Sequence, residues 1–153
     1  MSGNEKPRPR VLDEAEASRL LGARGFGVLA SVRASGHPHL TTVLYHWDGD
    51  RRLLRVSSTA DRGKPRQLSR DPHAALHVST PDHMAFAVVE GTAEVSEPTR
   101  EPGDAVGREL LSLLPEPPED EAAEAEFLRE QVAERRVVIR IRADRLYGTA
   151  LDM

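Results

Sequence analysis

The chain has 153 residues, of which 39% are hydrophobic, so it is long enough for one domain with its own core and too short for several. It contains no cysteine, which excludes disulfide bonds, thiolate nucleophiles, iron–sulfur clusters and cysteine-ligated zinc. No apolar run approaches the ~18 residues of a membrane helix, and no apolar segment follows the basic start as in a signal peptide. We therefore expect an unprocessed cytoplasmic protein that crosses no membrane.

The charges are unevenly distributed, although the formal net charge is only −4. Residues 51–70 hold seven basic side chains against one acid, whereas residues 97–134 hold twelve acids against three arginines. A short basic stretch in an acidic chain favours a compact anionic ligand. A nucleic-acid partner would need a broader basic surface and more stacking aromatics than 4% of the chain, so we expect none.

The start of the chain divides into an arm and a helix. Residues 1–10 combine prolines with charges, which is typical of a disordered arm. We expect a single domain over residues 11–153. Its first helix begins near Asp13, with acids in the first turn, and ends at Gly22–Gly25.

Segments with a period of two then predict strands joined by turns, including an Asp-Gly turn. A short basic helix at Arg66–Arg70 interrupts them and stops at Asp71-Pro72. Gly91 predicts a bulge or bend in the last of these segments. The predicted strands are Phe26–Arg33, His39–Trp47, Leu53–Ser58, Ala74–Thr80 and Ala85–Ser96.

The acidic stretch predicts a helical insert at about 97–134. Apolar residues recur at helical spacing over Asp104–Leu114, a PEPPED breaker follows, and a second helix covers Ala122–Glu134. A sixth strand, Val137–Gly148, alternates isoleucines with arginines. Six mostly antiparallel strands with late helices predict the α+β class and a small Greek-key barrel.

The chain shows no motif for a catalytic triad, a phosphate loop or a zinc protease, so the catalytic residues are unknown. Gly25-Phe26-Gly27 precedes a strand, whereas a dinucleotide fingerprint follows one. His37 and His39 would lie about 7 Å apart on one strand face, but two histidines alone do not complete a metal site. We favour a pair flanking a turn set by Pro38, and we expect no metal.

One segment concentrates anion-binding groups. Ser57, Ser58 and Thr59 end a strand, Arg62 and Lys64 follow in the turn, and the next helix presents free backbone N–H groups. Hydroxyls, cations and a helix start within nine residues fit a phosphate cradle. An ordinary strand-to-helix loop on a basic surface fits equally well. The residues alone leave both interpretations open.

The run VSSTADRGKPRQLSRDP, preceded by GHPHLTTVLYHWDGD and followed by AALHVST and VVEGTAEV, resembles the split β-barrel superfamily of pyridoxamine-phosphate-oxidase-like flavoproteins. It is most similar to the actinobacterial branch that binds the deazaflavin coenzyme F420 in place of FMN. The most specific piece is the R-x-K-x-R-x-L-x-x-D-P spacing at residues 62–72, and RRVVIRIRADRLYGTALD resembles the last strand of that branch. The resemblance runs from Leu12 onward.

The resemblance implies a six-stranded antiparallel split β-barrel of the FMN-binding type, forming a homodimer with the cofactor sites at the interface. Positions 57–64 would hold the cofactor phosphate, the backbone at 40–42 would line the ring, and the partner protomer would contribute residues 77 and 79. The implied cofactor-binding residues are Leu40, Thr41, Thr42, Ser57, Ser58, Thr59, Arg62, Lys64, His77 and Ser79.

The implied activity is hydride transfer from reduced coenzyme F420 to a conjugated small molecule, such as a biliverdin-like tetrapyrrole, a quinone or an enone. Because the cofactor carries the hydride, no dedicated nucleophile is required. Carboxylates of such a substrate would find partners among Arg55, Arg140 and Arg142. The pyridoxamine phosphate oxidases carry a C-terminal extension with Arg and His that this sequence lacks, which argues against that substrate.

Two alternatives remain beside this activity. The first is an FMN-binding oxidoreductase of the same fold. The second is a non-enzymatic protein that sequesters a cofactor or haem. A haem would need an axial ligand, for which His37, His39 and His83 are the candidates.

Overall fold

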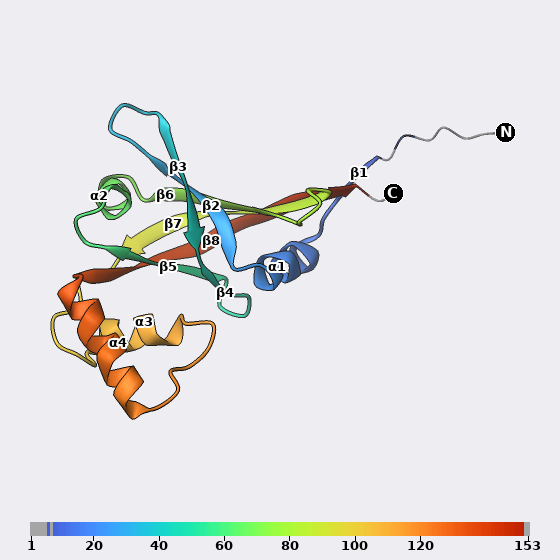
Figure 1. Cartoon of the computed structure of the whole chain (residues 1–153). Helices are drawn as coiled ribbons and strands as arrows, with labels where there is room; N and C mark the ends of the chain where they lie inside the picture. The colour runs from blue at the N-terminus through green and yellow to red at the C-terminus, as the bar shows by residue number, and fades with distance from the viewer. Residues whose placement is uncertain (1–5, 7, 152–153) are drawn as a thin grey trace.

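The computed structural model describes residues 6 and 8–151, and within them eight strands form one antiparallel sheet surrounded by four helices (Figure 1). None of these helices is both long and apolar enough to span a membrane. The elements in chain order are β1 (Pro9–Val11), α1 (Glu14–Ala23), β2 (Phe26–Val32), β3 (Pro38–Leu44), β4 (His46–Asp48), β5 (Leu53–Thr59), α2 (Gly63–Arg70), β6 (His73–Ser79), β7 (Ala85–Val95), α3 (Ala105–Ser112), α4 (Glu121–Ala133) and β8 (Arg136–Leu151).

The sheet curls until its two ends meet at one residue. Its strand order is β3-β2-β6-β7-β8-β5-β4, with β1 paired to β8 off this path. β3 and β4 stand at opposite ends of that order, yet only Tyr45 separates them in the chain. The Tyr45 side chain is buried, and its hydroxyl donates a hydrogen bond to the Leu21 carbonyl oxygen at 2.6 Å. Burial raises the pKa of Tyr45, so the phenol stays neutral and keeps donating.

The concave face of the curled sheet encloses the core. Alternate residues of the strands point inward, as at Leu54 and Val56 on β5, and Leu29, Leu76 and Ile139 are fully buried. Each such side chain stabilises the fold by about 1.5–3 kcal/mol through burial. Helix α1 adds its own apolar stripe to this core, since two of its residues are 0% exposed.

The start of α1 follows the expected capping chemistry. The Asp13 carboxylate accepts a hydrogen bond from the Glu16 backbone N–H at 2.8 Å, and the Glu16 side chain accepts one from the Asp13 N–H. This capping box satisfies two backbone donors that a helix start otherwise leaves free. The predicted helix start at Asp13 is confirmed.

β7 bends where the sequence predicts it. The register between β7 and β8 shifts between Glu90 and Gly91, and a Cβ atom on Gly91 would overlap the carbonyl oxygen of Arg142. Only a residue without a side chain permits this close approach of two strands. The bend lets the long β7–β8 pair follow the curl of the sheet.

Helices α3 and α4 lie together against one end of β8, outside the core (Figure 1). The loop before α3 is ordered by Asp104, whose carboxylate accepts hydrogen bonds from the Thr99 hydroxyl and from the backbone N–H groups of Arg100, Glu101 and Gly107. Desolvation alone would raise the pKa of Asp104, but these donors outweigh it and hold the pKa well below the usual range. The charged carboxylate thus fixes the entry to α3.

The α+β class and the antiparallel sheet are confirmed, whereas the strand number differs from the six predicted. The predicted strand His39–Trp47 is two strands, because Tyr45 turns the chain from one end of the sheet to the other. The added strand β1 overlaps the predicted arm, residues 1–10, of which 1–5 and 7 lie outside the described residues. β1 is held by backbone pairing with β8, a distant partner that local composition does not report.

Candidate functional site

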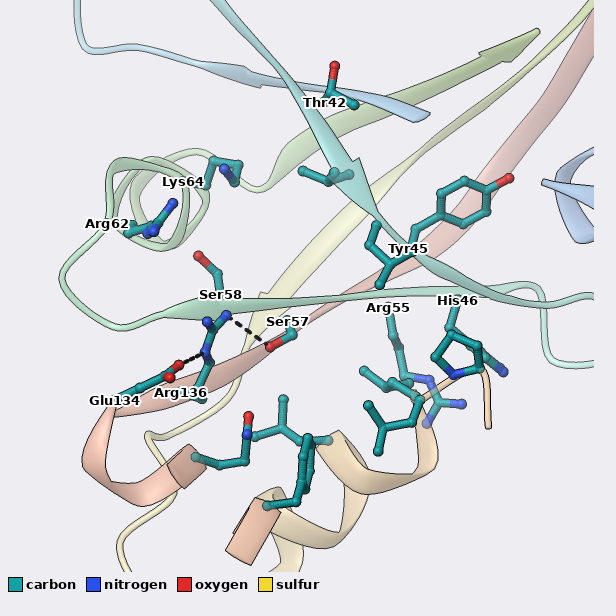
Figure 2. Close-up of a pocket in the computed structure, with 18 residues that line it drawn as sticks. Thr42, Tyr45, His46, Arg55, Ser57, Ser58, Arg62, Lys64, Glu134 and Arg136 are labelled. Carbon is teal, nitrogen blue, oxygen red and sulfur yellow. Dashed lines mark hydrogen bonds and ion pairs between the residues drawn. The ribbon is translucent and has the colours of Figure 1, made fainter. Parts of the chain in front are cut away.

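A cavity of about 460 Å³ opens beside Tyr45, between the sheet and helices α3 and α4 (Figure 2). This volume falls within the range of small-molecule sites. The lining comes from both ends of the sheet and from the acidic segment. Its residues are Thr42, Val43, Leu44, Tyr45, His46, Arg55, Ser57, Ser58, Arg62, Lys64, Leu110, Leu113, Leu114, Pro115, Phe127, Gln131, Glu134 and Arg136.

One end of the cavity is cationic. Arg62 is the N-cap residue of α2, and Lys64 lies in the first turn of that helix. Among the described residues neither side chain has an ion-pair partner, whereas the nearby Arg136 pairs with Glu134 at 2.6 Å. The free backbone N–H groups at the α2 start add positive potential. This end of the cavity therefore has positive charge that no carboxylate within residues 6 and 8–151 neutralises.

The pKa of Lys64 is lowered in this environment. Burial lowers the pKa of Lys64 below its ordinary value, and the neighbouring Arg62 lowers it further. Both causes reflect a cation without an anion to stabilise it. The charge of a bound anion would oppose both effects by stabilising the ammonium, so the site favours a negatively charged ligand.

The Ser58 hydroxyl indicates what kind of ligand the cationic end of the cavity could hold. Its side chain is 3% exposed and its hydroxyl has no hydrogen-bond partner within the described part of the chain. A buried polar group without a partner costs about 1–3 kcal/mol. Ser57, next to it on β5, accepts only a long hydrogen bond of 3.4 Å from Arg136. The Ser58 hydroxyl lies on the same side of β5 as Arg62 and Lys64 (Figure 2), and together these groups fit the oxygen atoms of a phosphate group.

The opposite wall of the cavity is apolar. α3 and the loop after it contribute Leu110, Leu113 and Leu114, and α4 contributes Phe127. These side chains give a planar ligand an apolar surface and exclude water from it. The cavity thus combines a phosphate-sized polar end with space for a ring system.

The end of the cavity away from α2 carries a second polar pair, His46 and Arg55 (Figure 2). His46 on β4 and Arg55 on β5 are directly paired across the two strands. The Nδ1 atom of His46 and the Nε atom of Arg55 are buried without a hydrogen-bond partner among the described residues. Glu109 on α3 approaches Arg55 to 3.5 Å.

Five of the ten residues expected to bind the cofactor line the cavity. They are Thr42, Ser57, Ser58, Arg62 and Lys64.

The other five expected residues do not line it. Leu40 is 61% exposed on the outer face of β3, and Thr41 points the other way with a buried hydroxyl that has no partner in the described residues. Thr59 shapes the turn, since its carbonyl oxygen accepts the Arg62 N–H at 3.1 Å. On β6, the His77 ring stacks on a phenylalanine, and the Ser79 hydroxyl pairs with a histidine four residues later. Within one protomer, these two residues are not part of the cavity.

Of the three arginines proposed for a substrate, only Arg55 lines the cavity. Arg140 is occupied by Glu109, which accepts three hydrogen bonds from it, and by a longer contact with Glu94. Arg142 is exposed outside the cavity. Local alternation placed all three on strands but could not show which of them helix α3 covers.

None of the candidate haem ligands lines the cavity. The Nδ1 atom of His39 lies 3.0 Å from the Gln67 side-chain oxygen, and that of His83 lies 3.0 Å from the Ser79 hydroxyl. His37 is exposed in the turn before β3. Residues 6 and 8–151 contain no group of three or more potential metal-ligating side chains.

Sequence reasoning missed several cavity residues, notably His46, Arg136 and Phe127. His46 lies in a segment predicted as a strand, Phe127 lies in a predicted helix, and Arg136 lies just before the predicted strand Val137–Gly148. Their contribution depends on α3 and α4 packing against β8, which no local pattern reports.

A family model described as pyridoxamine 5'-phosphate oxidase matches residues 13–150. The chain belongs to the pyridoxamine 5'-phosphate oxidase family. The resemblance of the sequence to this superfamily is confirmed, and membership supports an oxidoreductase of the flavin-binding type.

Solved structures agree with this family. An F420 reductase is 29% identical with a TM-score of 0.60, and the match covers 84% of this chain and 94% of that one. A conserved hypothetical protein, Rv2991 from Mycobacterium tuberculosis, is 25% identical with a TM-score of 0.69, covering 91% and 85%. An FAD-binding protein from Mesorhizobium loti, 17% identical with a TM-score of 0.64 over 94% and 99%, shares the fold.

Proposed function

We propose that this protein is a reductase that transfers a hydride from reduced coenzyme F420 to a conjugated small molecule, such as a tetrapyrrole, a quinone or an enone. The observation that carries the proposal is the phosphate-sized polar end of the cavity, where Arg62 and Lys64 lack anionic partners within the described residues and the Ser58 hydroxyl is buried unpaired. The likeness to an F420 reductase supports the choice of cofactor.

Each part of the cavity has a role in this activity. Arg62, Lys64, Ser57 and Ser58 bind the cofactor phosphate, and the backbone around Thr42 lines the ring. When bound, the deazaflavin supplies the hydride, so the protein needs to provide binding, orientation and exclusion of water. The apolar wall of the cavity, formed by leucines of α3 and of the loop after it and by Phe127 on α4, excludes water from the ring. It also holds an unsaturated substrate against the ring.

We further propose that the sheet is a split β-barrel of the FMN-binding type and that two copies form a homodimer. β3 lies at the end of the sheet order, and the outer face of β2 and β3 exposes Phe26, Leu40 and Leu44 by 49–67%. Contiguous apolar surface of this kind is typical of a protein–protein interface. In the dimer, His77 and Ser79 of the second copy would complete the cavity of the first.

An FMN-dependent oxidoreductase is the second candidate, because the polar end of the cavity recognises a phosphate, which FMN and F420 share. The ring is what distinguishes them. The three histidines expected as haem ligands, His37, His39 and His83, give no support to haem sequestration, since all three lie off the cavity.

A parallel titration with F420 and FMN, followed by cofactor fluorescence, tests the proposal. We expect micromolar binding of F420 and much weaker binding of FMN. Consumption of reduced F420 with quinones, enones and tetrapyrroles, followed by the return of oxidised-cofactor absorbance, then tests the reductase activity. The reverse binding preference would assign the protein to FMN, and binding of neither would overturn the cofactor site.

A further inference from the structure

We propose that His46 and Arg55 form a carboxylate-binding subsite at the end of the cavity away from α2. The proposal rests on the proposed function, because the carboxylate would enter the same cavity as the cofactor. It adds a substrate class: conjugated molecules that carry a carboxylate.

The two side chains are positioned by the sheet. Since His46 and Arg55 are directly paired across β4 and β5, both leave the sheet on the same face and meet at the cavity wall. Figure 2 shows them together on the side opposite Arg62 and Lys64. Along β5, Arg55 lies two residues from Ser57, about 7 Å in an extended strand. A ligand group at this subsite is therefore separate from a phosphate at the α2 end.

Two nitrogen atoms at this subsite have no hydrogen-bond partner in the described residues. Arg55 Nε and His46 Nδ1 are buried and unpartnered. The planar fork of the Arg55 guanidinium matches the two oxygens of a carboxylate. Leaving such groups unpaired destabilises the protein unless a ligand supplies the acceptor.

Glu109 is a carboxylate close to Arg55, but its shorter hydrogen bonds are with Arg140. It accepts hydrogen bonds from Arg140 through both oxygens, whereas the contact with Arg55 Nη1 is longer at 3.5 Å. The hydrogen bonds from Arg140 also hold the pKa of Glu109 below its usual value, so it remains ionised. Glu109 thus holds the Arg55 guanidinium in place, and the buried Nε atom stays without a partner among the described residues.

The surroundings favour a carboxylate attached to an apolar body. Leu110, which follows the Arg55 partner Glu109 on α3, lines the cavity together with Leu113. Two ligands of the proposed reaction carry such a group: a conjugated carboxylate substrate, and the oligoglutamate tail of F420 itself. Both present the same chemistry to His46 and Arg55.

Cinnamate and methyl cinnamate are a matched pair of probes that differ in the charge. We expect the wild-type protein to bind cinnamate more tightly than the ester by calorimetry, and Arg55→Met to lose roughly tenfold or more in cinnamate affinity with little change for the ester. Arg142→Met, which removes an exposed arginine of β8 outside the cavity, is the control and should bind both probes as the wild type does. If Arg55→Met fails to fold, His46→Phe, which keeps an aromatic ring without the donor, should show a several-fold loss.

Titrations with F420 and FMN identify the source of the carboxylate. A loss of F420 affinity in Arg55→Met, with FMN affinity unchanged, supports the subsite and assigns it to the cofactor tail. A loss of cinnamate affinity with both cofactors unaffected supports it and assigns it to the substrate. Unchanged binding of cinnamate and F420 in Arg55→Met and His46→Phe would overturn the subsite. Failure of the wild type to bind F420 or FMN would instead count against the proposed function, so the two failures are distinguishable.

Discussion

Lys64 is the residue on which the proposed phosphate site depends most. It is a half-buried ammonium beside Arg62, in the first turn of α2 and without an anionic partner in the described chain. We expect Lys64→Ala to weaken cofactor binding by about 1.5–3 kcal/mol, as for a charge-assisted hydrogen bond. Calorimetric titration measures this loss. The control is Arg66→Ala, which removes an exposed cation of the same helix outside the main cavity. Equal cofactor affinity in the two variants would exclude Lys64 from the site.

The lowered pKa of Lys64 also predicts the pH dependence of binding. Burial and then Arg62 shift this pKa below 10.5, so the ammonium loses its proton at a lower pH than an ordinary lysine. Cofactor affinity should therefore fall as the pH rises through this lowered pKa. Lys64→Arg keeps the charge, so its affinity should stay level over the same range. Fluorescence titrations from neutral pH to about pH 10 compare the two proteins, and parallel curves would contradict the assignment.

At the scale of elements, two glycines offer a matched test of the bend in β7. A Cβ on Gly91 would overlap the Arg142 carbonyl oxygen, so Gly91→Ala should destabilise the protein by about 1–3 kcal/mol. On α1, a Cβ on Gly22 meets only the Trp47 ring at 3.9 Å, so Gly22→Ala should stabilise it by about 0.5–1 kcal/mol. Denaturant unfolding measures both changes. Equal effects would show that the bend does not require glycine.

Some strands could be predicted from the sequence alone, whereas others could not. The segments at β2, β5 and β7 match their predicted bounds to within a residue or two, because alternation along a strand is a local property. The break at Tyr45 and the strand β1 were missed, since each depends on a partner far away in the chain.

The candidate site shows the same division. Residues 57–64 stand close together in the sequence, so their cluster of hydroxyls and cations was visible before the fold was known. The subsite of His46 and Arg55 and the apolar wall of α3 were not, because β4, β5 and α3 come together only in the folded chain.

At the scale of the whole molecule, the exposed apolar face of β2 and β3 predicts self-association. Phe26 is 67% exposed and pairs with Leu44, which is 49% exposed. Phe26→Glu would place a charge in this face, and we expect the mass from light scattering to fall from two chains to one. Cofactor affinity should fall with it, because the second copy would no longer complete the cavity. Val11→Glu, at a 78% exposed position on β1, is the control. A wild-type protein that is monomeric would contradict the proposal.

The position of β8 has a consequence for the order of assembly during synthesis. β8 is the last described strand, and β5 and β7 become neighbours only through it. On the ribosome, their facing edges therefore stay unpaired until residues 136–151 emerge. Open strand edges invite pairing with other nascent chains. The acidic segment at 97–134 emerges just before β8, so the acidic segments of two chains at this stage repel each other while these edges are open.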